Sequence, residues 1–353
     1  MKEARGVHTH QEIWEQSIAW EATLVHILQQ EEKIRRFFQE GGFREAIFTG
    51  CGSTYYLSLA AAAIFQTLTG VRTRALPASE LLLFPNSSLL REEPALLVAV
   101  SRSGETTETL RAVQLFKEGY GKEVLAITCY EGSKLMAYAS LGLTAKEAKE
   151  RSVAQTRSFA SMFLVAQLCA GIAAEDPDYC NQLTTLPDHG KRLMAEESSL
   201  IKKVGEDLNF RRFFFLGSGP HYGLACEGML KMKEMSLSYA EAFHFLEFRH
   251  GPKSMVDEET LLIGLLSDSA RRYEVALLAE MRGYGAKTLV LAEEGESGEL
   301  SADYVVPLRC GLTEMARGLL FMPLLQLLAY HRAMAKGLDP DRPRNLEPVV
   351  LLD

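Results

Sequence analysis

The sequence has no C-x-x-C pair, no apolar stretch long enough to cross a bilayer, and no excess of basic residues. Its six cysteines are scattered, which in a chain of 353 residues indicates reduced thiols rather than a disulfide framework. The most apolar stretches, Met162–Ala174 and Leu319–Tyr330, are too short or too interrupted to span a membrane. The polar first twenty residues lack the apolar core of a signal peptide. We therefore predict a cytoplasmic protein without a membrane partner.

A formal net charge of −8 argues against a nucleic-acid partner, because nucleic-acid-binding proteins usually present a basic face. No His, Cys and Asp cluster has the spacing of metal ligands, so we predict no metal. The glycine-rich turns lack the P-loop spacing, and Gly50-x-Gly52 lacks the third glycine of a dinucleotide fingerprint. We predict no cofactor. None of these observations argues against a phosphorylated small molecule, since an acidic protein can hold a locally positive pocket.

Short apolar runs alternate with helical patterns, which predicts an α/β fold with doubly wound, mostly parallel sheets covered by helices on both faces. The runs predicted as strands are Ala46–Thr49, Ala95–Val100, Val124–Thr128, Leu141–Thr144, Phe213–Leu216, Thr260–Leu266, Thr288–Ala292 and Tyr304–Leu308. Three strand positions recur at a separation of roughly 165 residues, and this favours duplication of one domain. Glycine-rich turns at Gly50–Ser53 and Gly217–Pro220 follow corresponding strands.

Proline and glycine near Leu186–Gly190 predict a boundary between two domains, covering residues 1–186 and 187–353. We expect the helical stretch Glu12–Glu40 to pack as an arm on the first domain. In open doubly wound sheets, ligands bind at the carboxyl ends of the strands. The loops that follow the strands are therefore the candidates for function.

The loop after Leu96–Val100 carries two serines, a glycine and two threonines, and it opens a helix at Ser101–Glu108. The unpaired N–H groups and the partial positive charge of a helix start favour a phosphate. An ordinary N-cap would use the same residue types. The Gly50–Thr54 turn favours phosphate, because it supplies a second cradle at the same edge of the sheet.

The helix after Gly219 carries Glu227, Lys231 and Glu234 within about 40° of one line, because their offsets are four and seven residues. Such a row can be a solvated face of salt bridges, or a proton-transfer pair facing a cleft. His250 follows in a Gly-Pro turn with cationic neighbours, and imidazole is suited to pass a proton near neutral pH. A lone histidine is otherwise usually structural.

At these motifs the sequence resembles the sugar isomerase (SIS) domain family, in which two tandem SIS domains each form a flavodoxin-like sheet. The segments that carry the resemblance are Gly50–Ser53, Ser101–Glu108, Ser152–Phe159, Glu227–Glu234 and Phe248–Lys253. Two branches of the family are most similar. One contains the isomerase part of glucosamine-6-phosphate synthase and the archaeal-type glucosamine-6-phosphate deaminases. The other is the AgaS branch, which acts on galactosamine 6-phosphate or tagatose 6-phosphate.

The resemblance implies a role for each matching position. Glu234 is expected to move a proton between C1 and C2 of the sugar, with Glu227 and Lys231 supporting the acyclic form. His250 is expected to open the sugar ring from the neighbouring subunit of a homodimer with shared active sites. Contacts to the phosphate and the sugar are expected from Cys51, Gly52, Ser53, Ser101, Arg102, Ser103, Thr106, Val153 and Arg344.

Two positions depart from the family pattern. The phosphate loop often has glutamine where Arg102 stands, and a cation there should favour the dianion. Pro348 stands where the synthase has a lysine that forms a Schiff base with the sugar. Ring opening then relies on His250 alone, or the aligned register differs, or this branch works without the imine.

We expect an isomerising deaminase that converts a glucosamine- or galactosamine-6-phosphate type substrate to the ketose 6-phosphate and ammonia. The sequence begins Met1-Lys2-Glu3 without a glutaminase domain, so we expect the degradative direction. The alternatives are a plain aldose–ketose isomerase of the tagatose-6-phosphate type and a sugar-amine 6-phosphate deglycase. A sugar-phosphate sensor is the non-enzymatic alternative, although a sensor needs no proton relay.

Overall fold

The computed structural model describes residues 5–90, 94–294, 301–347 and 349, and the chain divides into two compact units. The first unit comprises Glu15–Glu150 and Arg157–Pro187. The second comprises the residues up to Trp14, Arg151–Thr156 and Asp188–Leu346. The division along the chain falls inside helix α11 (Leu186–Glu206), not in an irregular linker. The domain limits 1–186 and 187–353 remain our proposal.

The first unit is built on a parallel five-stranded sheet in the order β2-β1-β3-β4-β5. Its strands are β1 (Glu45–Gly50), β2 (Arg72–Pro77), β3 (Ala95–Val100), β4 (Glu123–Thr128) and β5 (Leu141–Thr144). The central strand β3 is buried along its whole length, as expected for a strand covered on both faces. This strand order is that of a flavodoxin-like doubly wound sheet.

The second unit repeats this topology with a parallel sheet in the order β7-β6-β8-β9-β10. Its strands are β6 (Arg212–Gly217), β7 (Tyr239–His244), β8 (Thr260–Leu265), β9 (Lys287–Ala292) and β10 (Tyr304–Pro307). The turns after the first strands also match. Gly52 has φ 56° and ψ −123°, and Gly219 has φ 53° and ψ −130°. The predicted α/β fold with two similar halves is confirmed.

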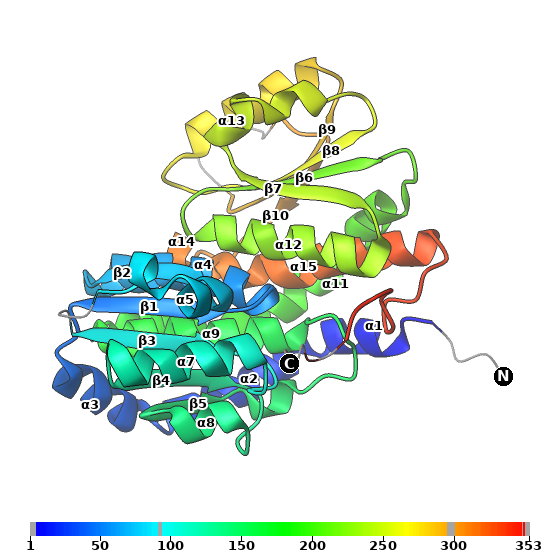
Figure 1. The fold of residues 1–353 in the computed structure, drawn as a ribbon. Helices are drawn as coiled ribbons and strands as arrows, with labels where there is room; N and C mark the ends of the chain where they lie inside the picture. Colours follow the sequence, from blue (N-terminus) through cyan, green and yellow to red (C-terminus); the bar gives the residue numbers. More distant parts are fainter. Residues whose placement is uncertain (1–4, 91–93, 295–300, 348, 350–353) are drawn as a thin grey trace. The chain divides into compact units, whose positions relative to one another are not determined.

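Helices cover both faces of each sheet (Figure 1). In the first unit they are α2 (Gln16–Leu28), α3 (Glu31–Gly41), α4 (Ser53–Thr69), α5 (Ala78–Leu83), α6 (Pro85–Ser88), α7 (Thr107–Gly119), α8 (Lys134–Tyr138), α9 (Arg157–Ala173) and α10 (Pro177–Thr184). Helices α4 and α9 pack together on one face, and α5, α7 and α8 lie on the other. Helices α2 and α3 pack on α9.

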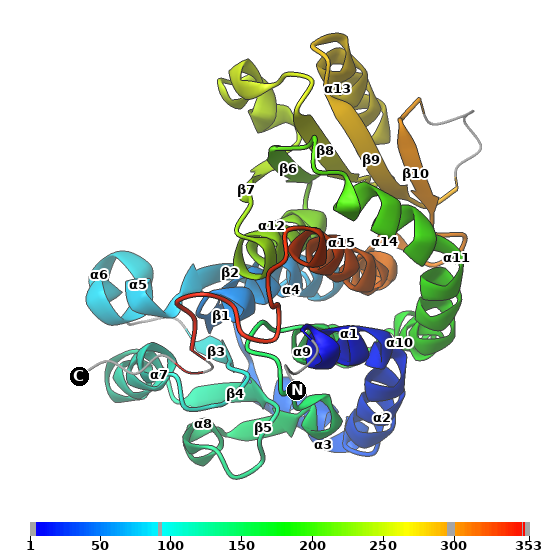
Figure 2. The ribbon, with the colours of Figure 1, turned by 90° about the vertical axis from the view of Figure 1, so that its right-hand side faces the viewer.

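The helices of the second unit are α1 (Val7–Trp14), most of α11, α12 (Pro220–Ser236), α13 (Arg271–Gly283), α14 (Glu314–Arg317) and α15 (Phe321–Ala335). Figure 2 shows α13 on one face of this sheet and the packed pair α12 and α15 on the other. Helix α1 packs on α15, so the expected arm on the first domain begins only at α2. No helix among the described residues is long and apolar enough to cross a membrane.

All eight predicted strands are present, with ends within a residue of the predicted ones. The two strands that the apolar pattern missed are β2 and β7. Both are edge strands next to the first strand of their sheet, and both are partly exposed. Their sequences, RTRALP and YAEAFH, contain no continuous apolar run because only part of each strand is buried.

Candidate active site

The predicted phosphate loop lies where the strand order of the first sheet reverses. Strands β1 and β3 are neighbours, with Thr49 beside Ala99, and their connections leave toward opposite sides of the sheet. The loops Cys51–Gly52 and Ser101–Thr106 therefore start from adjacent strand ends. Ligands of open α/β sheets bind at such a switch point.

The loop Ser101–Thr106 is folded by its own hydroxyl groups. The N–H of Gly104 donates to Ser101 Oγ at 3.1 Å, and the N–H of Glu105 donates to Ser103 Oγ at 3.1 Å. The hydroxyls of Ser101 and Thr106 lie 3.3 Å apart. A Cβ on Gly104 would lie 2.2 Å from Ser133 Oγ, so only glycine fits this close approach. The loop thus gathers hydroxyl groups at the start of α7, where no side chain caps the helix.

Arg102 is held by a carboxylate that the sequence analysis did not select. Its guanidinium lies 3.5 Å from Glu150, whose side chain is fully buried. Glu150 also accepts a hydrogen bond from the N–H of Ser158 at 3.2 Å, and one from its hydroxyl. The backbone oxygen of Arg102 accepts bonds from Thr128 Oγ1 and the N–H of Cys129, both at 3.1 Å. Arg102 is therefore fixed at both its backbone and its side chain.

The turn after β1 places Cys51, Gly52 and Ser53 at the start of α4. Thr54 Oγ1 accepts from the N–H of Cys51 at 2.9 Å, which closes the turn. The Cys51 thiol lies 3.6 Å from the hydroxyl of Thr109 on α7. Burial raises the pKa of this thiol to about 11, so Cys51 stays protonated near neutral pH. Ser53 is buried, and Gly52 is exposed at the helix start.

The row predicted on α12 is a buried ion cluster and not a solvated face. The side chains of Lys231 and Glu227 have no exposed surface, and Lys231 Nζ lies 3.2 Å from Glu227 Oε1. Lys231 also donates to Glu234, whose side chain is 18% exposed. Burial alone would lower the pKa of Lys231, but the two carboxylates outweigh burial and raise it. The cluster therefore contains a cation, a buried carboxylate and a second carboxylate that reaches the surface.

His250 is exposed on a segment that is tightly anchored on both sides. Phe248 is buried, with its ring 5.0 Å from that of Phe214. The carboxylate of Glu280 on α13 forms ion pairs with Arg249 Nε at 2.8 Å and with Lys253 Nζ at 3.1 Å. These contacts fix the backbone on either side of His250 and leave its imidazole exposed to solvent.

The two remaining predicted residues lie in the second unit. Val153 belongs to the segment Arg151–Thr156, which packs with this unit although its neighbours in the chain do not. Arg344 is exposed in a turn near the carboxyl end. Pro348, the position expected for the Schiff-base lysine, lies outside the described residues.

At the corresponding switch point of the second sheet, the loop after β8 is hydrogen-bonded to carboxylates. Ser267 donates to the buried Glu274 through its N–H at 2.8 Å and its hydroxyl at 3.0 Å. The N–H groups of Asp268 and Ser269 donate to Glu314 at 2.9 and 3.3 Å. Burial raises the pKa of Glu274. Carboxylates of the protein thus already accept hydrogen bonds from the N–H groups of Ser267, Asp268 and Ser269 in this loop.

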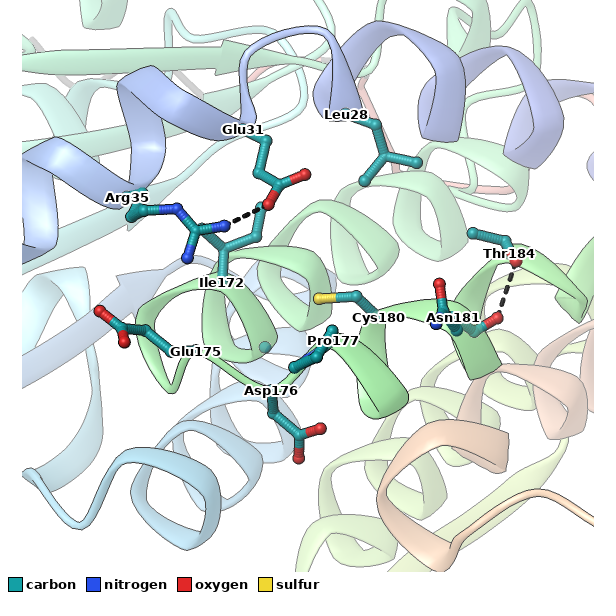
Figure 3. A pocket seen from close by; sticks show the side chains of 11 residues that line it. Leu28, Glu31, Arg35, Ile172, Glu175, Asp176, Pro177, Cys180, Asn181 and Thr184 are labelled. Atoms are coloured by element: carbon teal, nitrogen blue, oxygen red, sulfur yellow. Dashed lines mark hydrogen bonds and ion pairs between the residues drawn. The ribbon is translucent and has the colours of Figure 1, made fainter.

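A pocket of about 470 Å³ opens elsewhere in the first unit, between α2, α3, α9 and α10 (Figure 3). Glu31, Arg35 and Glu175 contribute charges to its wall, and Glu31 is paired with Arg35. None of the predicted site residues lines it. We therefore do not assign the substrate to this pocket.

The SIS domain model matches residues 44–170 and 209–331. The isomerizing glutamine–fructose-6-phosphate aminotransferase of Escherichia coli K12 is 31% identical over 314 residues, which are 86% of this chain and 51% of that protein. The enzyme of the same name from Methanothermobacter thermautotrophicus is 29% identical over 317 residues, 89% of this chain and 52% of that protein. The chain thus spans about half the length of these curated relatives.

Two solved structures are similar over nearly the whole chain. Glucosamine-6-phosphate deaminase from Thermotoga maritima is 29% identical, with a TM-score of 0.82 over 98% of this chain and 100% of that one. Tagatose-6-phosphate ketose/aldose isomerase from Escherichia coli is 26% identical, with a TM-score of 0.87 over 99% of this chain and 96% of that one. These homologues and structural neighbours are enzymes of phosphorylated sugars.

Proposed function

Because this chain belongs to the SIS domain family, we propose that it is a phosphosugar isomerase that also deaminates, converting a 6-phosphorylated 2-amino sugar to the ketose 6-phosphate and ammonia. The observation that carries the proposal is the ion cluster of Glu227, Lys231 and Glu234 on α12. A sugar-phosphate sensor needs a phosphate cradle but gains nothing from burying a lysine between two carboxylates. Desolvating charges is costly, so this cluster supports an acid–base role.

Phosphate recognition is assigned to the first unit. Ser101, Ser103 and Thr106 surround the start of α7, where hydroxyl and N–H donors meet the positive end of the helix. Each charge-assisted hydrogen bond to a phosphate contributes about 1.5–3 kcal/mol, so three of them suffice for ground-state binding. Arg102 adds a positive charge whose position Glu150 holds.

The proton transfer is assigned to Glu234. In the open-chain aldehyde, Glu234 removes the C2 proton while O1 takes up a proton from solvent, and an ene-aminol forms across C1 and C2. Glu234 returns its proton to C1 while the amino group gives up a proton to solvent, which leaves an imine at C2. Water adds to C2, the C–N bond breaks, and ammonia leaves with the ketose 6-phosphate as the second product. Lys231 holds Glu234 in place and balances its charge.

The similarity to the Thermotoga maritima deaminase supports the deaminating reaction. The similarity to the Escherichia coli tagatose-6-phosphate isomerase favours a second candidate, a plain aldose–ketose isomerase, which needs the same proton transfer without loss of ammonia. We further propose that the enzyme is a homodimer with shared sites, in which His250 opens the ring bound by its partner, and that it is cytoplasmic.

The test is a panel of glucosamine, galactosamine and tagatose 6-phosphates with the purified chain, with released ammonia and ketose phosphate measured separately. Ammonia and ketose in equal amounts from an amino sugar support the deaminase. Interconversion of tagatose 6-phosphate without activity on amino sugars supports the plain isomerase. Binding of the panel without any turnover would leave only the sensor.

A further inference from the structure

Helix α1 holds the segment Arg151–Thr156 through a buried carboxylate. Glu12 accepts hydrogen bonds from two successive N–H groups, that of Arg151 at 2.5 Å on Oε1 and that of Ser152 at 3.1 Å on Oε2. Glu12 is almost fully buried, so these charge-assisted bonds are shielded from water. The other end of the segment is held from α15, where Gln326 donates to the backbone oxygen of Thr156 at 3.2 Å.

The same helix holds the carboxyl-terminal tail. Asp341 accepts from the N–H groups of His8 at 3.1 Å and Thr9 at 2.7 Å, and Asp339 accepts from the N–H of Gly6 at 3.0 Å. The first N–H groups of a helix lack partners within the helix, and carboxylates are stabilised at its positive end. The tail therefore caps α1, and α1 fixes the tail about three residues before Arg344.

One hydroxyl joins the two contacts. Thr9 Oγ1 donates to Asp341 Oδ1 at 2.7 Å and lies 3.0 Å from Ser152 Oγ. A hydroxyl has a single proton, so Ser152 must be the donor to Thr9 when Thr9 donates to Asp341. Thr9 and Ser152 are both buried. The result is a directed chain of hydrogen bonds from the segment that carries Val153 to the tail that carries Arg344.

We propose that Thr9 and Glu12 are positioning residues, which couple the segment Arg151–Thr156 to the carboxyl-terminal tail. This coupling holds Val153 and Arg344 in the positions at which both bind the same phosphosugar. This inference rests on the proposed function for the identity of the ligand, but the coupling itself is a property of the second unit. Neither residue touches the reacting atoms. Their loss should therefore weaken substrate binding much more than it slows the chemistry.

The test compares three threonine variants. Thr9→Val keeps the volume and removes the hydroxyl, and Thr9→Ser keeps the hydroxyl. Thr23→Val is the matched control, because Thr23 is equally buried in a helix but donates only to Ala19 within α2. With the panel substrate that the wild type turns over, Thr9→Val should raise KM about tenfold and change kcat less than threefold, since two hydrogen bonds are lost. Thr9→Ser and Thr23→Val should stay within about twofold of the wild type.

Amide hydrogen exchange provides a readout that needs no substrate. Thr9→Val should accelerate exchange in a peptide covering residues 151–156 and in one covering 339–346, and Thr23→Val should change neither. If Thr9→Val proves insoluble, Ser152→Ala breaks the same chain of bonds from the other side. Unchanged exchange in both peptides would overturn the coupling even in an active enzyme. Equal effects of Thr9→Val and Thr23→Val on KM would overturn the positioning role. Faster exchange in a protein that turns over no sugar phosphate would retain the coupling and reject the proposed function.

Discussion

Replacing Glu234 with glutamine should abolish turnover and leave the fold intact. Glutamine keeps the volume of glutamate and can still accept a hydrogen bond from Lys231, but it cannot take up a proton from carbon. Loss of a positioned base typically costs about 10²–10⁴-fold in rate. Lys231 retains Glu227 at 3.2 Å, so its charge stays compensated. Because Glu234 is the partly exposed member of the cluster and Lys231 keeps Glu227, we expect a smaller loss of stability than from the same change at Glu227.

Glu227→Gln is the informative partner of this variant. Its carboxylate is fully buried beside Lys231, and breaking a buried pair typically destabilises by about 3–5 kcal/mol. Glu234→Gln should therefore mainly lower kcat, whereas the isosteric Glu227→Gln should mainly lower the free energy of unfolding. The measurements are kcat on the preferred substrate, incorporation of deuterium from heavy water into the product at C1, and urea unfolding. A Glu234→Gln enzyme with near-normal kcat and normal deuterium incorporation would refute the assignment of the base.

Three further predictions concern other parts of the molecule. Ser103→Ala should raise KM more than it lowers kcat, because it removes a proposed ligand of the phosphate in the ground state. Equal affinity for phosphorylated and unphosphorylated sugar would contradict this. If the sites are shared in a two-fold dimer, co-expression of the Glu234→Gln and His250→Ala chains should restore wild-type function to about a quarter of all sites. Verified hybrid dimers that show no recovery would exclude sharing. His221 is fully buried against Phe321, and burial lowers its pKa to about 4 from 6.5. As the pH falls, the unfolded chain therefore takes up a proton at this histidine before the folded chain does. The free energy of unfolding should fall by ~3 kcal/mol between pH 6.5 and 4. His221→Phe should remove part of that loss in acid unfolding curves.

The structure of the loop that we propose to bind phosphate was predictable because its signal is local. An apolar strand, a hydroxyl-rich turn and a helix start follow one another at Leu96–Glu108, and the structure contains them in that order. The alignment of Glu227, Lys231 and Glu234 was equally predictable from helical periodicity. Their burial was not, because it depends on how α12 packs against β6, β7 and α15, which no local pattern contains.

Residues that act through distant partners escaped the sequence analysis. Glu150 lies 48 residues from Arg102, and Asp341 lies 332 residues from Thr9. A lone acidic residue in a polar stretch carries no signal that its partner is a loop elsewhere in the fold. Edge strands β2 and β7 escaped for a related reason. Their burial comes from neighbours on one side only, which leaves an irregular pattern instead of an apolar run.

The duplicated fold has two switch points, and the two are satisfied in different ways. A buried N–H without a partner costs about 1–3 kcal/mol, so the buried N–H groups of Gly104 in the first unit and Ser267 in the second need acceptors even without a ligand. In the second unit the acceptor is the carboxylate of Glu274, and Glu314 accepts from the exposed N–H groups beside it; a phosphate would have to displace both against charge repulsion. In the first unit the acceptors are the neutral hydroxyls of Ser101 and Ser103, which can turn toward an incoming phosphate and become donors to it. This difference between the two repeats supports the proposal that the phosphate binds in the first unit.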